Sequence, residues 1–591
     1  MMESSTLIAI LAVVIPIIGG PFCYVVEKIS PKARTIYAIT LGFITAGLTL
    51  SLIPSITEGS VNDFLWIPGA NISLGICLDS LSVFVAIIAG CIGALALLYS
   101  IRYMKHAEHE YSLSRYYWQT LFFIGGMIGL ALTSNLLVMY IFWEIIGFCS
   151  YALIGYYYHD PEPIPAGTKA FIVTRIGDIG FLAGILILWH ATGSLNVFEI
   201  MNVASTVSPV LLGLAGAGFI AGAVGKSAQF PLHVWLPDAM VAPTTITSLI
   251  HAACLVNAGV YLLARSYPIF MGLAGWSTAI LWIGTITAFL AATIALTEWD
   301  IKRVLAYSTI SQLGYMMAAI GAGAILASKF YLLSHGIFKA LLFLCAGAII
   351  YVTGTKDMRE MGGLRKHMKI THICAILGLL SLVGIPVLTG FFSKHMILAH
   401  LHAGGLYEAF ALLAITAFLT AAYSWRMYWL TFQGDRRSKV KIHEAPWQMT
   451  VPLIVLAAAS LLFWLYISPY TASMASSLPH YSIAHITLGN FIQHAFAGPT
   501  IWITVGVAIL IALLTIKWKA TVINAFRKPS ALTLPLMKAY WFDIFYNKCV
   551  RGLFRFWQQF RRIQTGDLNY NNLGIVIGFV IFLVLLLVWT V

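Results

Sequence analysis

Charged side chains are scarce in this sequence. Of its 591 residues, 60% are hydrophobic and 10% are charged, whereas soluble domains carry about 25% charged residues. This composition excludes an ordinary soluble enzyme and predicts an integral membrane protein. The first apolar segment, 6–26, is too long for a signal-peptide core and lacks a cleavage pattern, so we expect it to be a first span.

Clustered cysteines are absent as well. The chain has eight cysteines, and no two stand in a CxxC pair, so the usual sequence signatures of iron–sulfur clusters, c-type haem and thioredoxin-like sites are missing. The glycine-rich run GLAGAGFIAG at 213–222 lies inside an apolar segment and indicates helix packing rather than phosphate binding. We therefore expect no cofactor and no metal in this chain.

Apolar runs separated by short polar breaks predict an all-α membrane protein, because a spanning helix needs about 20 mostly apolar residues. The only division between the fourth and fifth runs is Ser134 and Asn135. The sixteen predicted spans are 5–27, 35–54, 78–101, 118–135, 136–157, 167–190, 209–230, 245–266, 277–297, 303–321, 328–352, 370–402, 406–431, 449–469, 499–517 and 571–591.

Basic residues fall mostly on one side of these spans. With the N-terminus outside, 28 of the 35 Lys and Arg residues lie in inner segments, and Arg265 and Lys329 are the outer ones. Because inner loops of membrane proteins are enriched in Lys and Arg, this asymmetry supports the sixteen-span topology with both termini outside. The net charge of +13 is therefore a topology signal, and nucleic-acid binding is excluded.

Several ionisable residues nevertheless fall inside the predicted spans. A charge at a helix centre costs roughly 2.5–3.5 kcal/mol on insertion scales, so such residues are by default functional. They are Glu144, Arg175, Asp178, Lys226, His251, His335, Lys339, Lys394 and Arg426.

Depth separates these residues into two groups. Glu144, Lys226, Lys339 and Lys394 lie too deep to reach water easily, and burial favours the neutral form of a lysine unless an opposite charge is near. A buried lysine whose partner can move away is therefore a switchable proton carrier.

For the remaining residues a purely structural role is an alternative to a functional one. Arg175 can snorkel or pair with Asp178, three residues on. Arg426 lies near an inner helix end, where snorkelling is favoured. His251 and His335 could each be core histidines. However, His335 is four residues from Lys339, a spacing that suits proton transfer along one helix face.

Two spans contain proline near their lysines. Pro231 follows Lys226 by five residues, and Pro386 precedes Lys394 by eight. Irregular backbone at membrane depth is tolerated only inside protein or around a wet cavity, and paired broken helices in two halves mark transporter sites. We therefore predict that the seventh and twelfth spans are broken beside proton-carrying lysines.

Long motifs surround these residues. WEIIGFCSYALIG contains Glu144, KAFIVTRIGDIG contains Asp178, and GKSAQFPLHVWLPDAMVAPTTITSLIHAA contains Lys226 and His251. SHGIFKALLFLCAG and GIPVLTGFFSKH contain the two later lysines. These motifs resemble the antiporter-like family, which comprises distal membrane subunits of respiratory complex I (NADH:quinone oxidoreductase) and large subunits of Mrp-type cation/proton antiporters. The HEAPWQM run and the C-terminal segment resemble the chain L branch.

The resemblance implies two inverted five-helix repeats and a Glu144–Lys226 ion pair that Asp178 modulates. It also implies that His251, His335 and Lys339 continue a hydrated axis ending at Lys394, with Arg175, Pro231, Pro386 and Arg426 in support. The expected organisation is 1–110 (first three helices), 111–266 (first repeat), 267–432 (second repeat), 433–517 (two helices), 518–570 (amphipathic lateral segment) and 571–591 (last helix).

The expected function is proton translocation within a complex I-like assembly, driven by flavin, iron–sulfur and quinone chemistry in partner subunits and carried out beside related antiporter-like chains in a prokaryotic inner membrane. The lateral segment is short for this family, with only about 50 residues between the last two spans. Open alternatives are a sodium/proton antiporter subunit, a membrane-bound hydrogenase arm and an inorganic-carbon uptake subunit. The chain ends after the last predicted span, which disfavours the longer antiporter subunits, and the intact lysine set disfavours a structural spacer.

Overall fold

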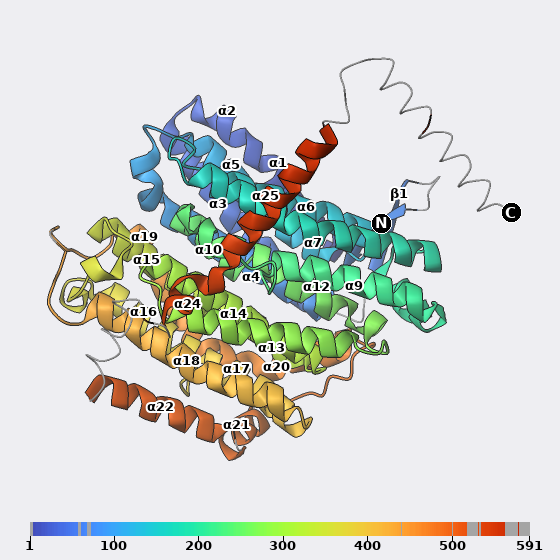
Figure 1. The fold of residues 1–591 in the computed structure, drawn as a ribbon. Helices are drawn as coiled ribbons and strands as arrows, with labels where there is room; N and C mark the ends of the chain where they lie inside the picture. Colours follow the sequence, from blue (N-terminus) through green and yellow to red (C-terminus); the bar gives the residue numbers. More distant parts are fainter. Residues whose placement is uncertain are drawn as a thin grey trace. The chain divides into compact units, whose positions relative to one another are not determined.

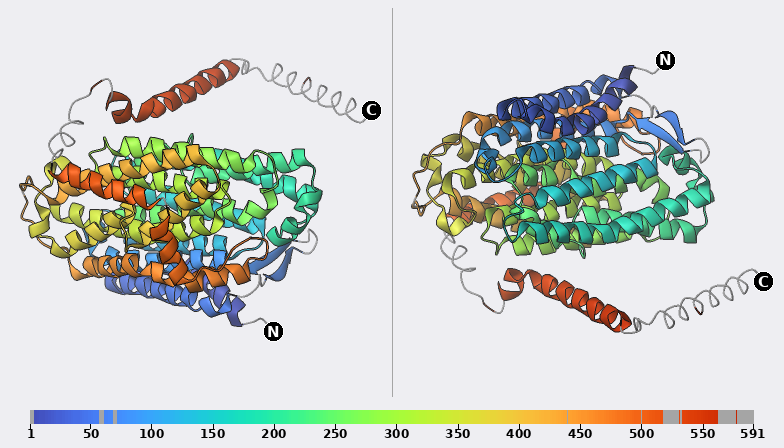
Figure 2. Two further views of the ribbon diagram at one scale, coloured as in Figure 1. Left: turned by 90° about the horizontal axis from the view of Figure 1, so that it is seen from below. Right: turned by 90° about the horizontal axis from the view of Figure 1, so that it is seen from above.

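The protein is described by a computed structural model that covers residues 4–56, 61–67, 72–438, 440–498, 500–516, 530, 533–561 and 577. The chain forms two compact units, Met1–Lys528 and Pro529–Val591. The first unit is a bundle of helices that run side by side, with α1 and α3 at one edge and α22 at another (Figure 1; Figure 2).

The bundle contains one β-hairpin and many helices. The strands are β1 (Val61–Ile67) and β2 (Ile72–Cys77). The helices are α1 (Ser4–Gly19), α2 (Cys23–Glu27), α3 (Pro31–Leu50), α4 (Ser80–Tyr103), α5 (Leu113–Leu132), α6 (Leu136–Ile154), α7 (Pro163–Thr192), α8 (Val197–Val203), α9 (Pro209–Lys226), α10 (Trp235–Asp238), α11 (Thr244–Ala252), α12 (Leu255–Phe270), α13 (Trp276–Ala295), α14 (Ile301–Gly321), α15 (Ile325–Thr353), α16 (Lys369–Val383), α17 (Thr389–Ala403), α18 (Tyr407–Phe432), α19 (Trp447–Leu462), α20 (Ile467–Ser477), α21 (Leu488–Ala497) and α22 (Ile501–Ile516).

Eleven helices of the described chain are long and apolar enough to cross a membrane, or twelve if the bent pair α21–α22 counts as one span. Every predicted span up to residue 516 contains a helix. The last predicted span, 571–591, lies outside the described residues apart from Ile577, so the count of sixteen stays a prediction. The α-helical membrane fold itself is confirmed.

Side-chain caps set several helix starts. The predicted boundary between the fourth and fifth spans is confirmed, because the Asn135 side chain accepts hydrogen bonds from the backbone N–H groups of Leu137 (2.8 Å) and Val138 (3.2 Å) and begins α6. Asp300 caps α14 in the same way. Such caps satisfy backbone donors that the first helical turn leaves unpaired.

The two predicted helix breaks are present. Helix α9 ends at Lys226 and α10 begins at Trp235, so Pro231 lies in an irregular stretch between them. Helices α16 and α17 are separated by 384–388, which includes Pro386. A third break, between α11 and α12 at 253–254, was not predicted, because no proline or glycine marks it.

The hairpin was also missed. Its strands pair antiparallel, with Val61 opposite Cys77, within the segment expected to be an outer loop. The backbone N–H of Ser134 donates to the Gly75 carbonyl at 3.0 Å, which ties the hairpin to the turn between α5 and α6. This hydrogen bond stabilises the turn from which α6 enters the bundle.

Glycines let α7 and α9 pack backbone to backbone. A Cβ on Gly177 would collide with the Ala221 carbonyl oxygen, and one on Gly218 would collide with that of Gly180. Membrane helices associate closely where small residues line their contact. The small-residue packing predicted for 213–222 is thus confirmed, and it presses Lys226 at the end of α9 against α7.

The smaller unit contains α24 (Thr533–Met537) and α25 (Phe542–Arg561). Helix α25 lies within the predicted amphipathic segment, 518–570. Its 20 residues correspond to about 30 Å at about 1.5 Å per residue.

We predict that Gly218→Leu abolishes accumulation of the folded chain in membranes, because no side chain fits between α9 and α7. Gly213→Leu on the same helix is the matched control, since nothing lies within 4 Å of its added Cβ. Quantitative immunoblotting of detergent-extracted membranes measures both. Equal accumulation of the two variants would contradict this packing.

Candidate proton-transfer site

Lys226 is the last residue of α9 and is fully buried. Its Nζ lies 3.2 Å from Oδ2 of Asp178 on α7 and 5.6 Å from the centre of the Trp143 ring on α6. The Trp143 indole N–H donates a 2.5 Å hydrogen bond to Oδ1 of the same carboxylate. Asp178 therefore joins three helices at the lysine and compensates its charge.

The expected Glu144–Lys226 pair is not what the structure contains. Oε2 of Glu144 lies 2.6 Å from Nη1 of Arg175, and this pair is partly exposed, with 22% and 35% of the side chains accessible. Lys226 Nζ instead lies against α6 at Gly147, where an added Cβ would be 2.6 Å away. Glu144 therefore faces Arg175 at the rim of the bundle.

The alternative pairing of Arg175 with Asp178 is also wrong. Although the two residues are three apart on α7, Arg175 extends toward Glu144 and stacks over the Phe171 ring at 4.5 Å. Asp178 points inward to Lys226. Two ion pairs are therefore present: Glu144–Arg175 joins α6 to α7 at the rim, and Asp178–Lys226 joins α7 to α9 in the interior.

His251 and His335 lie in the interior of the bundle. His251 is near the end of α11 and His335 is in α15, and both are fully buried. The helices approach closely here, since an added Cβ on Gly336 would be 2.7 Å from the Ala252 carbonyl oxygen. No side chain or backbone group of the described residues hydrogen-bonds either ring. Buried polar groups in proteins are otherwise paired with protein or ordered water, so these rings are suited to bind water.

Lys339 lies one turn after His335 on α15, as the spacing predicts. Its Nζ donates to the Leu305 carbonyl at 3.3 Å and to the Ser308 hydroxyl, both on α14. Within the described chain no carboxylate lies within 4.0 Å of this amine. Neutral oxygen partners hold the lysine without fixing a charge on it.

Lys394 lies on α17, beyond the second break. Its Nζ donates to the carbonyls of Leu382 (2.7 Å) and Val383 (3.3 Å), which end α16. The break depends on Gly390, where any Cβ would collide with the Ser381 carbonyl oxygen. The lysine therefore satisfies backbone acceptors that the interrupted helix exposes.

Helix α14 links these two lysines through residues that the sequence analysis did not single out. Ser308 accepts from Lys339, and the Tyr315 ring centre lies 5.5 Å from the Lys394 Nζ. Between them, Gln312 accepts a hydrogen bond from Tyr331. Ser308, Gln312 and Tyr315 are spaced by four and three residues, which places all three on one helix face. Polar residues at this spacing inside an apolar span are the sequence signal that could have identified them.

Arg426 is 1% exposed and so does not snorkel. Its guanidinium donates to the Glu298 carbonyl at 2.6 Å and lies 4.1 Å from the Trp299 ring centre. These contacts connect α18 to the turn before α14.

A second buried ionic cluster was missed. Arg265 and Lys329, expected on the outer side at the ends of their predicted spans, are each 2% exposed. Arg265 forms a two-armed ion pair with buried Asp79, with Nη2 at 2.7 Å from Oδ1. Lys329 lies 4.8 Å from the Tyr261 ring centre. Asp79 caps the start of α4 and Arg265 lies on α12. Because the two are 186 residues apart in sequence, no local pattern pairs them.

Two family models match the chain. One, described as NADH:quinone oxidoreductase/Mrp antiporter, TM, matches residues 133–420. The other, described as NADH-Ubiquinone oxidoreductase (complex I), chain 5 N-terminus, matches 66–117. NAD(P)H-quinone oxidoreductase chain 5 of Synechocystis sp. is 38% identical, over 85% of this chain and 82% of its own. The chain belongs to the chain 5 family of NAD(P)H-quinone oxidoreductases.

A second curated relative and two solved structures are also similar to this chain. The chain 5 protein of Picosynechococcus sp. is 37% identical over 86% of this chain and 83% of its own. Among solved structures, the Mrp complex from Dietzia sp. contains a similar chain, with a TM-score of 0.83 and 25% identity over 99% of this chain and 63% of that one. A chain of an archaeal membrane-bound sulfane sulfur reductase shares the fold, with a TM-score of 0.80 and 24% identity over 97% of this chain and 99% of that one.

This chain 5 family member should be destabilised strongly by Asp178→Asn. Removing one partner of a buried pair costs roughly 3–5 kcal/mol, because the other charge stays uncompensated. Glu144→Gln breaks a partly exposed pair and should cost less. The thermal dissociation temperature of the purified complex compares these matched amide substitutions. An equal or larger effect of Glu144→Gln would refute the pairing described above.

Proposed function

We propose that this chain is a proton-translocating membrane subunit of a complex I-like NAD(P)H:quinone oxidoreductase. The observation that carries the proposal is the buried Lys226–Asp178 pair at a helix break. In the interior, two imidazoles have no hydrogen-bond partner and two lysines have no carboxylate partner among the residues that the structure describes. The family supports the assignment of the complex.

The two neighbouring ion pairs supply a switch. In the state seen here, Arg175 holds Glu144 and Asp178 holds Lys226. Since Glu144 lies between Trp143 and Gly147, the two α6 residues that flank the Lys226 amine, movement of its carboxylate inward would change the charge around Lys226. Motion of a neighbouring subunit against the partly exposed Glu144–Arg175 pair would drive that exchange.

Separation of Lys226 from Asp178 would release a proton. A buried ammonium without a counter-charge is unfavourable, so the proton moves to a group that can receive it. His251 and His335 can accept on one ring nitrogen and release from the other, with water joining them to Lys226. Lys339 then receives the proton one turn along α15, and the Ser308–Gln312–Tyr315 face of α14 leads toward Lys394.

The same proposal includes the partner subunits, the repeats and the membrane of this chain. Flavin, iron–sulfur and quinone chemistry would lie in partner subunits, next to related antiporter-like chains. The helices 111–266 and 267–432 would act as inverted repeats around the line of charges. The membrane would be a prokaryotic inner membrane with both termini on its outer side, as the basic-residue asymmetry suggests.

A sodium/proton antiporter subunit is the second candidate, and similarity to the Mrp complex chain favours it. The identity of 38% to a chain 5 relative over most of both sequences favours the oxidoreductase. Affinity purification from native membranes separates the two: flavin and iron–sulfur signals in the isolated complex support our proposal. A complex free of redox centres, or one with nickel–iron subunits, contradicts it.

We predict that Lys226→Ala reduces proton pumping per quinone reduced at least several-fold, because the line loses its first carrier. Lys366→Ala, which removes an exposed loop lysine, is the matched control and should pump normally. A pH-sensitive dye in proteoliposomes containing the whole complex measures pumping beside quinone reduction. Undiminished pumping by the Lys226 variant would exclude this mechanism.

A further inference from the structure

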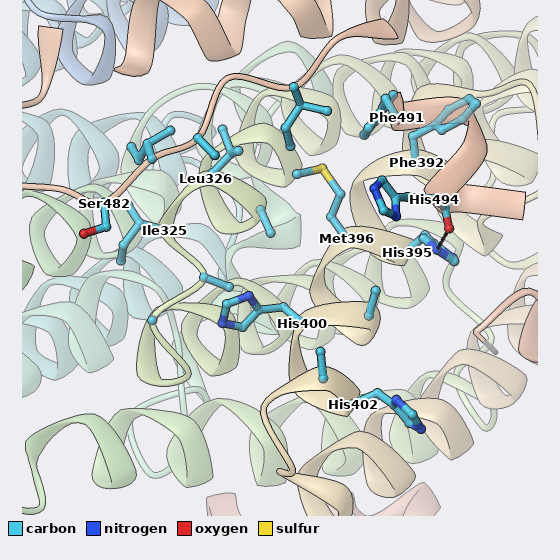
Figure 3. Close-up of a pocket in the computed structure, with 18 of the residues that line it drawn as sticks. Ile325, Leu326, Phe392, His395, Met396, His400, His402, Ser482, Phe491 and His494 are labelled. Carbon is cyan, nitrogen blue, oxygen red and sulfur yellow. Dashed lines mark hydrogen bonds between the residues drawn. The ribbon is translucent and has the colours of Figure 1, made fainter. Parts of the chain in front are cut away.

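Five of the 16 histidines of the chain line one cavity of about 700 Å³. Three belong to α17 and two to the segment between α20 and α22. Figure 3 labels the three histidines of α17 together with His494. These segments lie on the predicted outer side of the membrane. The histidines are His395, His400, His402, His480 and His494.

A second, much smaller cavity lies beside Lys394. Its volume of about 20 Å³ is enough for a single water molecule, which needs roughly 10–15 Å³. Lys394, Gly384 and Val383 line it, and so do His395 and Thr500. Because His395 and Thr500 also line the large cavity, they form the partition between Lys394 and that cavity.

The His395 ring is the ionisable group of this partition. His395 is 6% exposed. The Thr500 Oγ1 lies 2.9 Å from its Nδ1 and 3.0 Å from its Nε2, and the His494 carbonyl oxygen lies 3.3 Å from Nε2 (Figure 3). No ion pair of the described chain engages the ring. His494 and His400 are exposed, so the far side of the partition reaches the surface of this chain.

We propose that this histidine-lined cavity is the outward half of the proton path, with His395 as the relay at its inner wall. The Lys394 ammonium releases a proton and becomes a neutral amine; the proton crosses the small cavity on one water and is accepted by one His395 ring nitrogen. The ring releases a proton from its other nitrogen into the large cavity. This proposal rests on the proposed function, and it adds an outer exit to the proton path described there.

Access to the cavity is tested first. In the whole complex carrying Cys549→Ser, Met396→Cys places a thiol on the cavity wall, and a membrane-impermeant cationic thiol reagent is added from the outer side. We expect modification and a several-fold loss of proton pumping. Val210→Cys, 70% exposed at the start of α9, is the control and should be modified without loss. Failure of the reagent to modify the thiol introduced at position 396, or modification without loss, overturns the proposal.

The relay is tested by chemical rescue. His395→Ala should lower pumping several-fold, and added imidazole should restore it by filling the space of the missing ring. A ring needed only for packing against Phe391, 5.7 Å away, would give loss without dependence on the pKa of the rescuing base. Normal pumping by His395→Ala while Lys226→Ala fails would reject the exit alone, whereas normal pumping by Lys226→Ala would reject the proposed function.

Discussion

The buried ion pair of Lys226 with Asp178 is the interaction on which the arrangement of the bundle depends. A lone lysine at this depth would be unfavourable by several kcal/mol, and three helices converge to compensate it. Helix α7 supplies the carboxylate, α6 supplies the Trp143 N–H that orients it, and the glycine contact of α7 with α9 brings the charges together. The same contacts make the pair the point at which a movement of α6 or α7 changes a charge.

The helix breaks are subject to a second constraint: backbone groups at membrane depth need hydrogen-bond partners inside the protein. At the second break Lys394 supplies such a partner, because its amine donates hydrogen bonds to the carbonyls that end α16. At the other break, α9 ends at Lys226 itself. Each of these two lysines thus lies where a helix is interrupted.

Local signals in the sequence predicted much of this arrangement. Every predicted span up to residue 516 contains a helix, the Asn135 cap divided two of them, and prolines marked two breaks beside lysines. The ion-pair partners could not be predicted in the same way, because helical spacing shows which residues share a helix face but not which residues of a neighbouring helix they contact. Glu144 therefore received the wrong partner, and the Asp79–Arg265 pair went unnoticed across 186 residues.

The central claim is that water connects the buried amines through the two imidazoles. A cryo-EM map of the assembled complex, at a resolution that shows ordered water, tests it most directly. The account predicts water within hydrogen-bond distance of a ring nitrogen of both His251 and His335, in an unbroken chain from Lys226 to Lys339. Dry apolar packing around either ring, with no water within reach of its nitrogens, would contradict it.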